Sequence, residues 1–457
     1  MSDKIYTLPK GTEPTADVIG VLIKKHESDV KRFNTLKKYY DQKPMVSRES
    51  PNSLLVIVNH AKYITKINLG YLIGNPVEYQ VTKGVNIDPV LDQYKAQTIA
   101  NLDAELAKNC SIFGRAYEYV YSDEESALES VKLDPRSTIV VYDDTVKRKK
   151  MFAINYEPIC NDKGRKIANE YQVMIVTESA VMNRTLKGSA FLPYEEKDDE
   201  QIVFGEVPVI EYINNDDYEG DFEPVVTIID AYNILMSDRV LDRERLIDAI
   251  LAFYGMNLTP EQKKELKEGR VLTGVPMDAK IEYVIKQINE ADADVLRKNL
   301  AQDLHKISMT PDLSDENFVG NSSGVAILYK LLAFEENVKT KERYFERALM
   351  ERFELYNKFL SIKSNMPMVK TTEVDALFKR ALPRNDFEIS QMINNLVGIV
   401  DKELLVSQLS FVTDSGETVA LAGKESLKDG GSNNSDNYGE SGTFTGGETD
   451  ETDDTED

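Results

Sequence analysis

Cysteine and histidine are scarce in this chain of 457 residues, which contains two cysteines and three histidines. Cys110 and Cys160 are fifty residues apart, and neither belongs to a Cys or His spacing that is typical of a metal site. The sequence therefore argues against a disulfide framework, structural zinc and an iron–sulfur cluster. We expect a protein that is made and kept in a reducing cytosol, with no metal and no cofactor.

Long apolar runs are also missing. The longest apolar stretches, such as SLLVIV and TIVVY, have the length of a strand and fall far short of a membrane span. The first residues, MSDKIYTLPKG, do not combine a charged segment with an apolar run, so we expect no secretory signal. The sequence thus predicts a protein without membrane contact.

Common catalytic motifs are absent as well. The sequence contains no H-E-x-x-H and no G-x-x-x-x-G-K-[ST], which mark zinc proteases and P-loop nucleotide sites. His26, His60 and His305 stand near no Ser or Cys motif, so we expect them on the surface or in the core of helices. The sequence predicts that the protein is not an enzyme.

Two acidic clusters form the contrasting enzyme hypothesis. Asp143 and Asp144 are adjacent, and Asp216 and Asp217 belong to the run NNDDYEGD. Carboxylates gathered from separate elements hold Mg²⁺ in nucleases and phosphodiesterases. Here the acids cluster in turns beside strands and helices, where turn chemistry and favourable charge at helix N-termini explain them without metal. A metal-dependent nuclease therefore remains the alternative, and it requires these four aspartates.

Acidic residues outnumber basic ones, with 78 Asp and Glu against 55 Lys and Arg, a net charge of −23. This balance argues against a protein that coats nucleic acid by neutralising phosphates, but not against one that surrounds DNA without gripping it. After Lys428 there is no base, and ten acids follow. We expect residues 428–457 to form a disordered acidic tail, which either stays solvated or binds a partner. The remainder is still acidic, with 68 acids against 55 bases.

The first half of the chain predicts helices followed by strands. Helical spacing indicates helices over Asp17–Asp41, Ser53–Ile73 and Pro89–Asn109. The first is rich in lysine and arginine, which form either a solvated face or a patch for an acidic partner or nucleic acid. From Ser111 to Ile210, short alternating runs such as RAYEYVYS and STIVVYDD favour an antiparallel sheet. Helices packed against such a sheet predict an α+β fold.

The second half returns to helical spacing. We expect a helix from Glu223 that continues through Ile250 to Gly255, then a small insert with one short helix and strands, and a helix over Glu290–Ser308. The polar run TPDLSDENFVGNSSG separates this from a helix over Gly324–Ile362, which would be about 55 Å long at 1.5 Å per residue. Such a length indicates an elongated or ring-forming protein. A helical stretch follows within Glu373–Glu425.

Six strings in a fixed order resemble the portal proteins of long-tailed, double-stranded DNA bacteriophages. None is diagnostic alone, but together they span about residues 15–425. They are GYLIGNPVEY (Gly70–Tyr79), FGRAYEYVY (Phe113–Tyr121), LDPRSTIVVYDD (Leu133–Asp144), VPVIEYINNDDYEGDFEPV (Val207–Val225), IIDAYNILMSDRVLDRERLIDAILAFYG (Ile228–Gly255) and NFVGNSSGVAILYKLLAFEENVKTKERYFERAL (Asn317–Leu349).

The resemblance implies a ring protein with a mixed helix and sheet wing, a helical stem, a small α/β clip, a very long helix and a helical crown. By position, the implied regions are a wing (1–221), a helix leading to the stem (222–255), the clip (256–289), a stem helix (290–309), a channel loop (310–324), the long helix returning through the wing (325–372), a crown (373–427) and the acidic tail (428–457).

The resemblance also implies a function. Portal proteins form a ring, usually of twelve subunits and sometimes thirteen when isolated, at one capsid vertex of the virion. Double-stranded DNA is packaged and ejected through the channel. The implied partners are the terminase large subunit, the head–tail adaptor and the major capsid and scaffolding proteins, with assembly in the cytoplasm of the bacterial host. Another minor virion head protein is the remaining alternative, although such proteins are usually shorter.

Two residue groups are the sites that this resemblance implies. In the channel loop, amides, hydroxyls and glycines would contact DNA without fixed charge: Asn317, Gly320, Asn321, Ser322, Ser323 and Gly324. In the clip, a mixed charged cluster would dock the exchanging partners, because rim charges mainly set association rate and specificity. Its basic members are Lys263, Lys264, Lys267 and Arg270.

Overall fold

The computed structural model describes residues 4–43, 55–123, 127–161, 163, 166–188, 190–193, 199–247, 250–255, 257, 259–261, 263–264, 280–284, 290–313, 324–364, 366–380, 386–406 and isolated positions up to 421. The chain divides into two compact units, Met1–Ala381 and Leu382–Asp457.

The first unit begins with four helices. They are α1 (Ala16–Tyr40), α2 (His60–Ile73), α3 (Asp88–Ala96) and α4 (Ile99–Phe113). α1 confirms the predicted helix, with Thr15 as its N-cap. α2 is shorter than predicted, because Asn59 caps it by accepting a hydrogen bond from Lys62 N at 2.9 Å. The single helix expected over Pro89–Asn109 is two helices, interrupted at Thr98, whose φ is 52°.

The strands form two main sheets. The larger one follows the order β1 (Tyr6–Leu8), β5 (Thr138–Asp143), β6 (Lys150–Cys160), β7 (Lys166–Val176), β8 (Ala180–Lys187) and β10 (Glu200–Gln201), with β9 (Ala190–Pro193) also paired to β8. The smaller one has the order β11 (Val209–Ile213), β3 (Arg115–Ser122) and β4 (Leu128–Leu133). Their pairing is antiparallel, as predicted, except that β1 runs parallel to β5.

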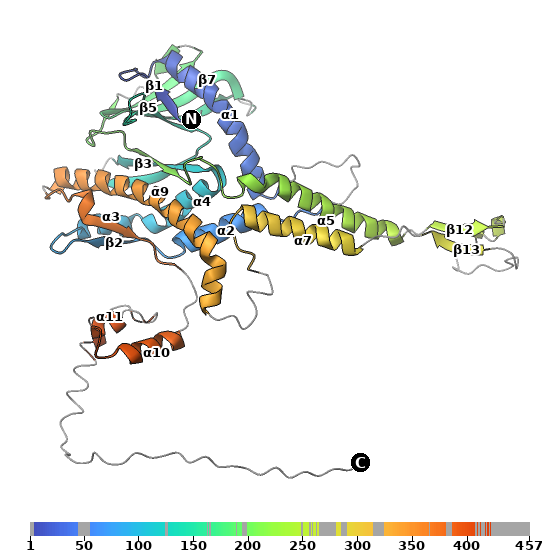
Figure 1. Cartoon of the computed structure of the whole chain (residues 1–457). Helices are drawn as coiled ribbons and strands as arrows, with labels where there is room; N and C mark the ends of the chain where they lie inside the picture. Colours follow the sequence, from blue (N-terminus) through green and yellow to red (C-terminus); the bar gives the residue numbers. More distant parts are fainter. Residues whose placement is uncertain are drawn as a thin grey trace, which may run out of the picture. The chain divides into compact units, whose positions relative to one another are not determined.

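Helix α1 covers the larger sheet (Figure 1). Its residues Ile19, Leu22 and Ile23 pack against Ile139 and Phe152 of β5 and β6, and all five are buried. The i, i+3, i+4 spacing of the helix residues places them on one face, which explains why this segment is helical and where it docks. The mixed helix and sheet architecture confirms the α+β class.

Two helices lie side by side after the sheets: α5 (Val226–Ile247), which follows the short 3₁₀ helix η1 (Glu223–Val225), and α7 (Glu290–Ile307) (Figure 1). The prediction that the helix from Glu223 continues through Ile250 is wrong. Ile250–Tyr254 is strand β12, paired antiparallel with β13 (Lys280–Val284). The run ILAFY is rich in β-branched and aromatic residues, which explains the change of structure.

The longest helix is α9 (Gly324–Ser364), with 41 residues. It confirms the long helix predicted from Gly324 and has a length of about 60 Å. After it come the 3₁₀ helix η2 (Thr371–Glu373) and strand β14 (Val374–Leu377), which pairs antiparallel with β2 (Glu78–Val81). This ladder joins segments almost three hundred residues apart.

The second unit contains α10 (Asp386–Leu396) and α11 (Lys402–Val406). Gly398, with φ of 88°, lies between them and provides the backbone conformation that most residues avoid. These helices confirm the helical stretch expected in this region. Across the part of the chain that the structure describes, no helix combines the length and the apolar character that crossing a membrane requires.

Candidate functional site

The predicted channel loop lies between α7 and α9. The structure describes residues 310–313, which follow α7, and places Gly324 as the first residue of α9. Five of the predicted contact residues lie outside the described residues: Asn317, Gly320, Asn321, Ser322 and Ser323. The described part of the predicted channel loop is therefore residues 310–313, which we call the loop base.

The predicted clip residues are described in part. Lys263 and Lys264 are exposed, and the backbone N–H of Lys263 donates to the carbonyl of Thr259 at 3.0 Å. Lys267 and Arg270 lie outside the described residues. The two described lysines are thus accessible to a partner.

The loop base is held by side chains of α2 and α7. The Tyr63 hydroxyl donates to the carbonyl of Pro311 at 3.0 Å and accepts from Leu313 N at 3.1 Å. His305 Nδ1 lies 3.0 Å from the carbonyl of Thr310, which is completely buried. These bonds fix the chain just before the segment that is predicted to face the DNA.

Asn68 links this base to the long helix. Its Nδ2 donates to Thr310 Oγ1 at 3.0 Å, and its Oδ1 accepts from Lys341 Nζ at 2.6 Å. Lys341 also pairs with Asp221 at 2.6 Å, and Asn214 donates to the same carboxylate oxygen. All of these side chains are buried. A polar group left here without its hydrogen bond would therefore cost the full free energy of its desolvation. One amide therefore connects both flanks of the predicted loop.

A second buried network holds α9 further along. Arg352, which is completely buried, lies 2.6 Å from Asp103 and 2.8 Å from Glu118. The Tyr212 hydroxyl donates to Glu118 at 2.6 Å. Burial raises the pKa of Asp103, while the charge of Arg352 acts in the opposite direction. This network joins the long helix to α4 and β3.

The three histidines each pack against aromatic side chains. His26 is buried, and its Nδ1 lies 2.9 Å from the Tyr156 hydroxyl. The rings of His60 and His305 have centroids 6.3 Å apart, and His60 meets Tyr232 edge to face at 4.7 Å. Burial, followed by the charge of His305, lowers the pKa of His60 to about 4. His60 therefore stays neutral at pH 7.

The predicted acidic clusters are used in turns. Asp143 Oδ1 accepts from the hydroxyl of Thr145 at 2.6 Å and from Lys149 N at 3.0 Å, and these bonds lower its pKa. Asp144 accepts from Lys10 N at 3.2 Å, while Asp216 and Asp217 lie in a turn. Among the residues that the structure describes, no group of three acidic, histidine or cysteine side chains is placed to hold a metal ion.

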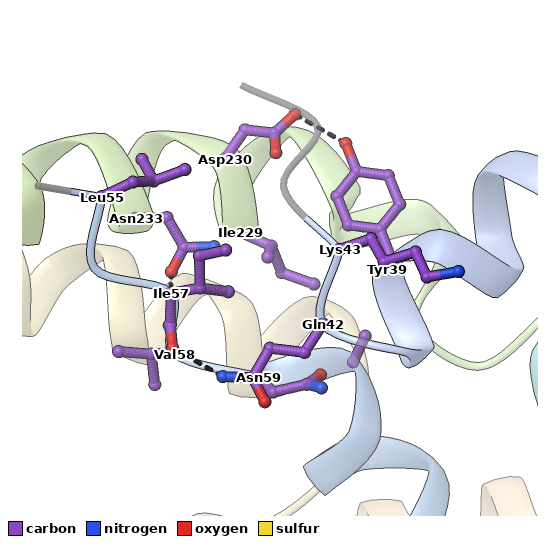
Figure 2. Close-up of a pocket in the computed structure, with 11 residues that line it drawn as sticks. Tyr39, Gln42, Lys43, Leu55, Ile57, Val58, Asn59, Ile229, Asp230 and Asn233 are labelled. Carbon is purple, nitrogen blue, oxygen red and sulfur yellow. Dashed lines mark hydrogen bonds between the residues drawn. The ribbon is translucent and has the colours of Figure 1, made fainter. Parts of the chain in front are cut away.

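A small pocket lies between the end of α1, residues 55–59 and α5 (Figure 2). The Tyr39 hydroxyl donates to Asp230 at 2.7 Å, and Val58 N donates to Asn233 Oδ1 at 2.8 Å. The pocket volume is about 20 Å³, which holds about one water molecule. The extended segment 55–58 thus bonds to side chains of α5, which explains why α2 does not begin earlier.

Sequence reasoning missed Tyr63, Asn68 and Lys341. The bonds from Tyr63 to Pro311, from Asn68 to Thr310 and from Lys341 to Asn68 each span more than 200 residues of the chain. No local pattern therefore joins them. One local signal exists, because Asn68 lies four residues from both Ile64 and Leu72 on the buried face of α2. A polar residue at a core position of a helix indicates a specific buried partner.

Comparisons with known proteins agree on one family. A family model described as phage portal protein, SPP1 Gp6-like, matches residues 19–430. The portal protein of Bacillus phage SPP1 is 25% identical over 370 residues, covering 78% of this chain and 73% of that protein. The portal protein of Clostridium phage phiCD119 is 21% identical over 417 residues, covering 87% and 89%. The chain therefore belongs to the SPP1 Gp6-like family of phage portal proteins.

Proposed function

We propose that this portal protein forms a closed ring at one capsid vertex, through whose channel double-stranded DNA is packaged and ejected. The observation that carries the proposal is the family match over residues 19–430, nearly the whole chain before the acidic tail. The family is structural, so we assign the protein no catalytic centre. The 41-residue helix α9 and the paired helices α5 and α7 provide the long elements that such a ring needs.

The parts of the ring follow the regions proposed from the sequence. Residues 290–309 supply the stem helix, 256–289 the clip, 310–324 the channel loop and 373–427 the crown. A closed ring requires heterologous contacts, in which one face of each subunit meets the opposite face of the next. We propose about twelve subunits, as the family resemblance implies.

We propose that the channel loop contacts DNA without holding it. A strongly basic lining would bind phosphates tightly and depend steeply on salt. Asn317, Asn321, Ser322 and Ser323 would instead offer neutral hydrogen bonds, with Gly320 and Gly324 providing backbone freedom. The bonds of Tyr63, Asn68 and His305 to Pro311 and Thr310 would keep the base of this loop in place during translocation.

The partners belong to the same proposal. Lys263 and Lys264, together with Lys267 and Arg270, would dock the terminase large subunit during filling and the head–tail adaptor afterwards. Charged rims suit partners that exchange, because they act mainly on association rate and specificity. The major capsid and scaffolding proteins would surround the ring during assembly in the bacterial host, and the completed ring would remain in the virion.

Negative-stain electron microscopy of the purified protein, with native mass determination on the same sample, tests this function. We expect rings of about twelve or thirteen subunits with an axial hole. A small closed dimer would contradict the proposal. Incubation of the same sample with linear DNA and Mg²⁺ tests the nuclease alternative. Cleavage that disappears when Asp143, Asp144, Asp216 and Asp217 are replaced by Asn would favour an enzyme instead.

A further inference from the structure

A cleft of about 490 Å³ opens between the β5–β6 turn and helix α9. Lys147 and Arg148 of the turn line one side, and Arg347 of α9 lines the other. Tyr218 and Thr371 add two hydroxyl groups to the lining. The cleft belongs to the first unit and shares no lining residue with the loop base, and the portal role proposed above assigns it nothing.

The carboxylates in this cleft already have partners. Glu211 accepts from the hydroxyls of Tyr117 at 3.1 Å and Tyr142 at 2.7 Å. Glu351 pairs with Lys150, and Glu354 pairs with Lys358 at 3.0 Å. Each negative charge in the lining is therefore engaged by a phenol or by a cation.

Five other donors in the lining have no such partners. Within the part of the chain that the structure describes, the side chains of Lys147, Arg148 and Arg347 make no hydrogen bond and no ion pair within 4 Å. The same holds for the hydroxyls of Tyr218 and Thr371. The cleft is thus lined by five donors without partners, three of them cationic, and by carboxylates that already have partners. Such a lining is complementary to an anion with several acceptor oxygens.

The positive charges of Arg148 and Arg347 both act on the Tyr218 hydroxyl. Burial and the charge of Glu211 raise the pKa of Tyr218, and the positive charges of Arg115, Arg347 and Arg148 oppose this rise. Arg347 and Arg148 come from α9 and from the β5–β6 turn, so both elements bring positive charge to the same cleft. Like charges gathered in this way repel each other until an anion joins them.

The backbone that carries these groups is strained and firmly held. Arg148 and Tyr218 have φ of 48° and 56°, in the left-handed region that non-glycine residues avoid. Asp143 holds the turn through Thr145 and Lys149, and Arg115 lies over the Tyr218 ring at 4.5 Å. Strain that surrounding contacts maintain is typical of residues positioned for a ligand.

We propose that this cleft binds a phosphate group through Arg148, Arg347, Lys147 and the Tyr218 hydroxyl. A phosphate monoester carries about −1.5 to −2 charges at pH 7 and three strong acceptor oxygens, so it balances three cations better than one carboxylate does. Guanidinium groups bind such oxygens in a bidentate manner. Free phosphate and the terminal phosphate of a nucleic acid share this chemistry.

Isothermal titration of the full chain with inorganic phosphate, in low-chloride buffer at fixed ionic strength, tests the site. We expect Arg347→Gln to weaken phosphate binding by about tenfold, since one charge-assisted bidentate contact is lost. Arg148→Gly should do the same, and it also relieves the left-handed backbone, so this variant is expected to fold. The matched control is Arg343→Gln, an exposed arginine one turn earlier on α9, which should leave binding unchanged.

A second titration identifies the source of the phosphate. A short oligonucleotide with a 5′-phosphate that binds more tightly than inorganic phosphate, and more tightly than its unphosphorylated form, indicates a nucleic-acid end; the reverse order indicates free phosphate. The proposal is overturned if neither probe binds, or if Arg343→Gln weakens binding as much as Arg347→Gln. Tighter binding of a short polyglutamate peptide would assign the cleft to an acidic protein segment instead. None of these results depends on ring formation.

Discussion

At the residue scale, buried charges fasten helix α9 to the rest of the first unit. Lys341 pairs with Asp221, and Arg352 pairs with Asp103 and Glu118, all in buried positions. Buried ion pairs add little net stability over apolar groups of similar size, but each is costly to break. Their effect is therefore on specificity: a helix shifted along its axis would leave these charges without partners.

Replacing Arg352 by methionine should destabilise the protein strongly. Asp103 and Glu118 would remain buried without their cation, at a cost of about 3–5 kcal/mol. Urea unfolding followed by circular dichroism measures this loss. The exposed control Arg343→Met should change stability by less than about 0.5 kcal/mol, and equal effects of the two variants would show that the Arg352 network has no such role.

The variant His60→Phe should reduce the sensitivity of the protein to mild acid. Because burial and the neighbouring His305 lower the pKa of His60 from 6.5 to about 4, between these values the unfolded chain binds a proton that the folded chain does not. The contribution of neutral His60 to the free energy of unfolding is therefore fully present above pH 6.5 and is lost as the pH falls towards 4. The decrease between pH 7 and pH 5 is about 2 kcal/mol for this residue, at about 1.36 kcal/mol per pH unit.

Urea midpoints of the wild type and His60→Phe at pH 7 and pH 5 provide the measurement. Phenylalanine keeps an aromatic ring against Tyr232, so the two proteins should be similar at pH 7. If both lose the same stability at pH 5, the protonation of His60 does not contribute.

At the element scale, long periodic segments could be predicted and junctions could not. The helices now seen as α1, α7 and α9 follow from apolar spacing, and the antiparallel strands follow from alternation. Gln97, beside the break at Thr98, bonds to Leu128 and Tyr356. The strand at Ile250–Tyr254 has a suitable local composition, but its partner strand lies thirty residues further along the chain. The loop base was missed for the same reason, since Asn68 meets Thr310 and Lys341 only in the folded chain.

The junction between α4 and β3 should depend on Gly114. Its φ is +83°, and a Cβ there would lie 2.1 Å from the backbone oxygen of Tyr218. Gly114→Ala should therefore cost more than about 3 kcal/mol, because backbone must move in addition to the left-handed strain of about 1–2 kcal/mol.

Gly84→Ala is the matched control for this junction. Gly84 also has positive φ, +93°, but its Cβ would meet open space. The free energy of unfolding of this variant should decrease only by the left-handed strain, about 1–2 kcal/mol. Thermal unfolding of both variants separates the two effects, and equal losses would mean that the close approach of Tyr218 is unimportant.

At the scale of the whole molecule, negative charge dominates. Each chain carries a net charge of −23, so the copies of a homo-oligomer repel one another at long range. Contacts in a ring must overcome this repulsion through apolar and paired charged surfaces. At 0.1 M salt, repulsion between exposed charges that are more than about 10 Å apart is largely screened. Ionic strength therefore acts directly on assembly.

Salt should favour the ring. We expect a larger fraction of rings at about 0.5 M than at about 0.05 M sodium chloride, where the screening length is several times greater. Size-exclusion chromatography with light scattering measures the fraction. A chain truncated after Lys428 lacks ten acids and should assemble at lower salt. A ring fraction that decreases with salt in the full chain would contradict this expectation.

The pairing of β2 with β14 has a consequence for biosynthesis. Glu78 faces Leu377 in this ladder, so β2 has no partner strand until almost three hundred further residues have been translated. At about 5–20 residues per second, the ribosome needs roughly 15–60 s for this length. During that time the nascent subunit exposes an open strand edge, which is a site for unwanted pairing between chains. Completion of the first unit, and with it competence to form the proposed ring, therefore comes only near the end of translation.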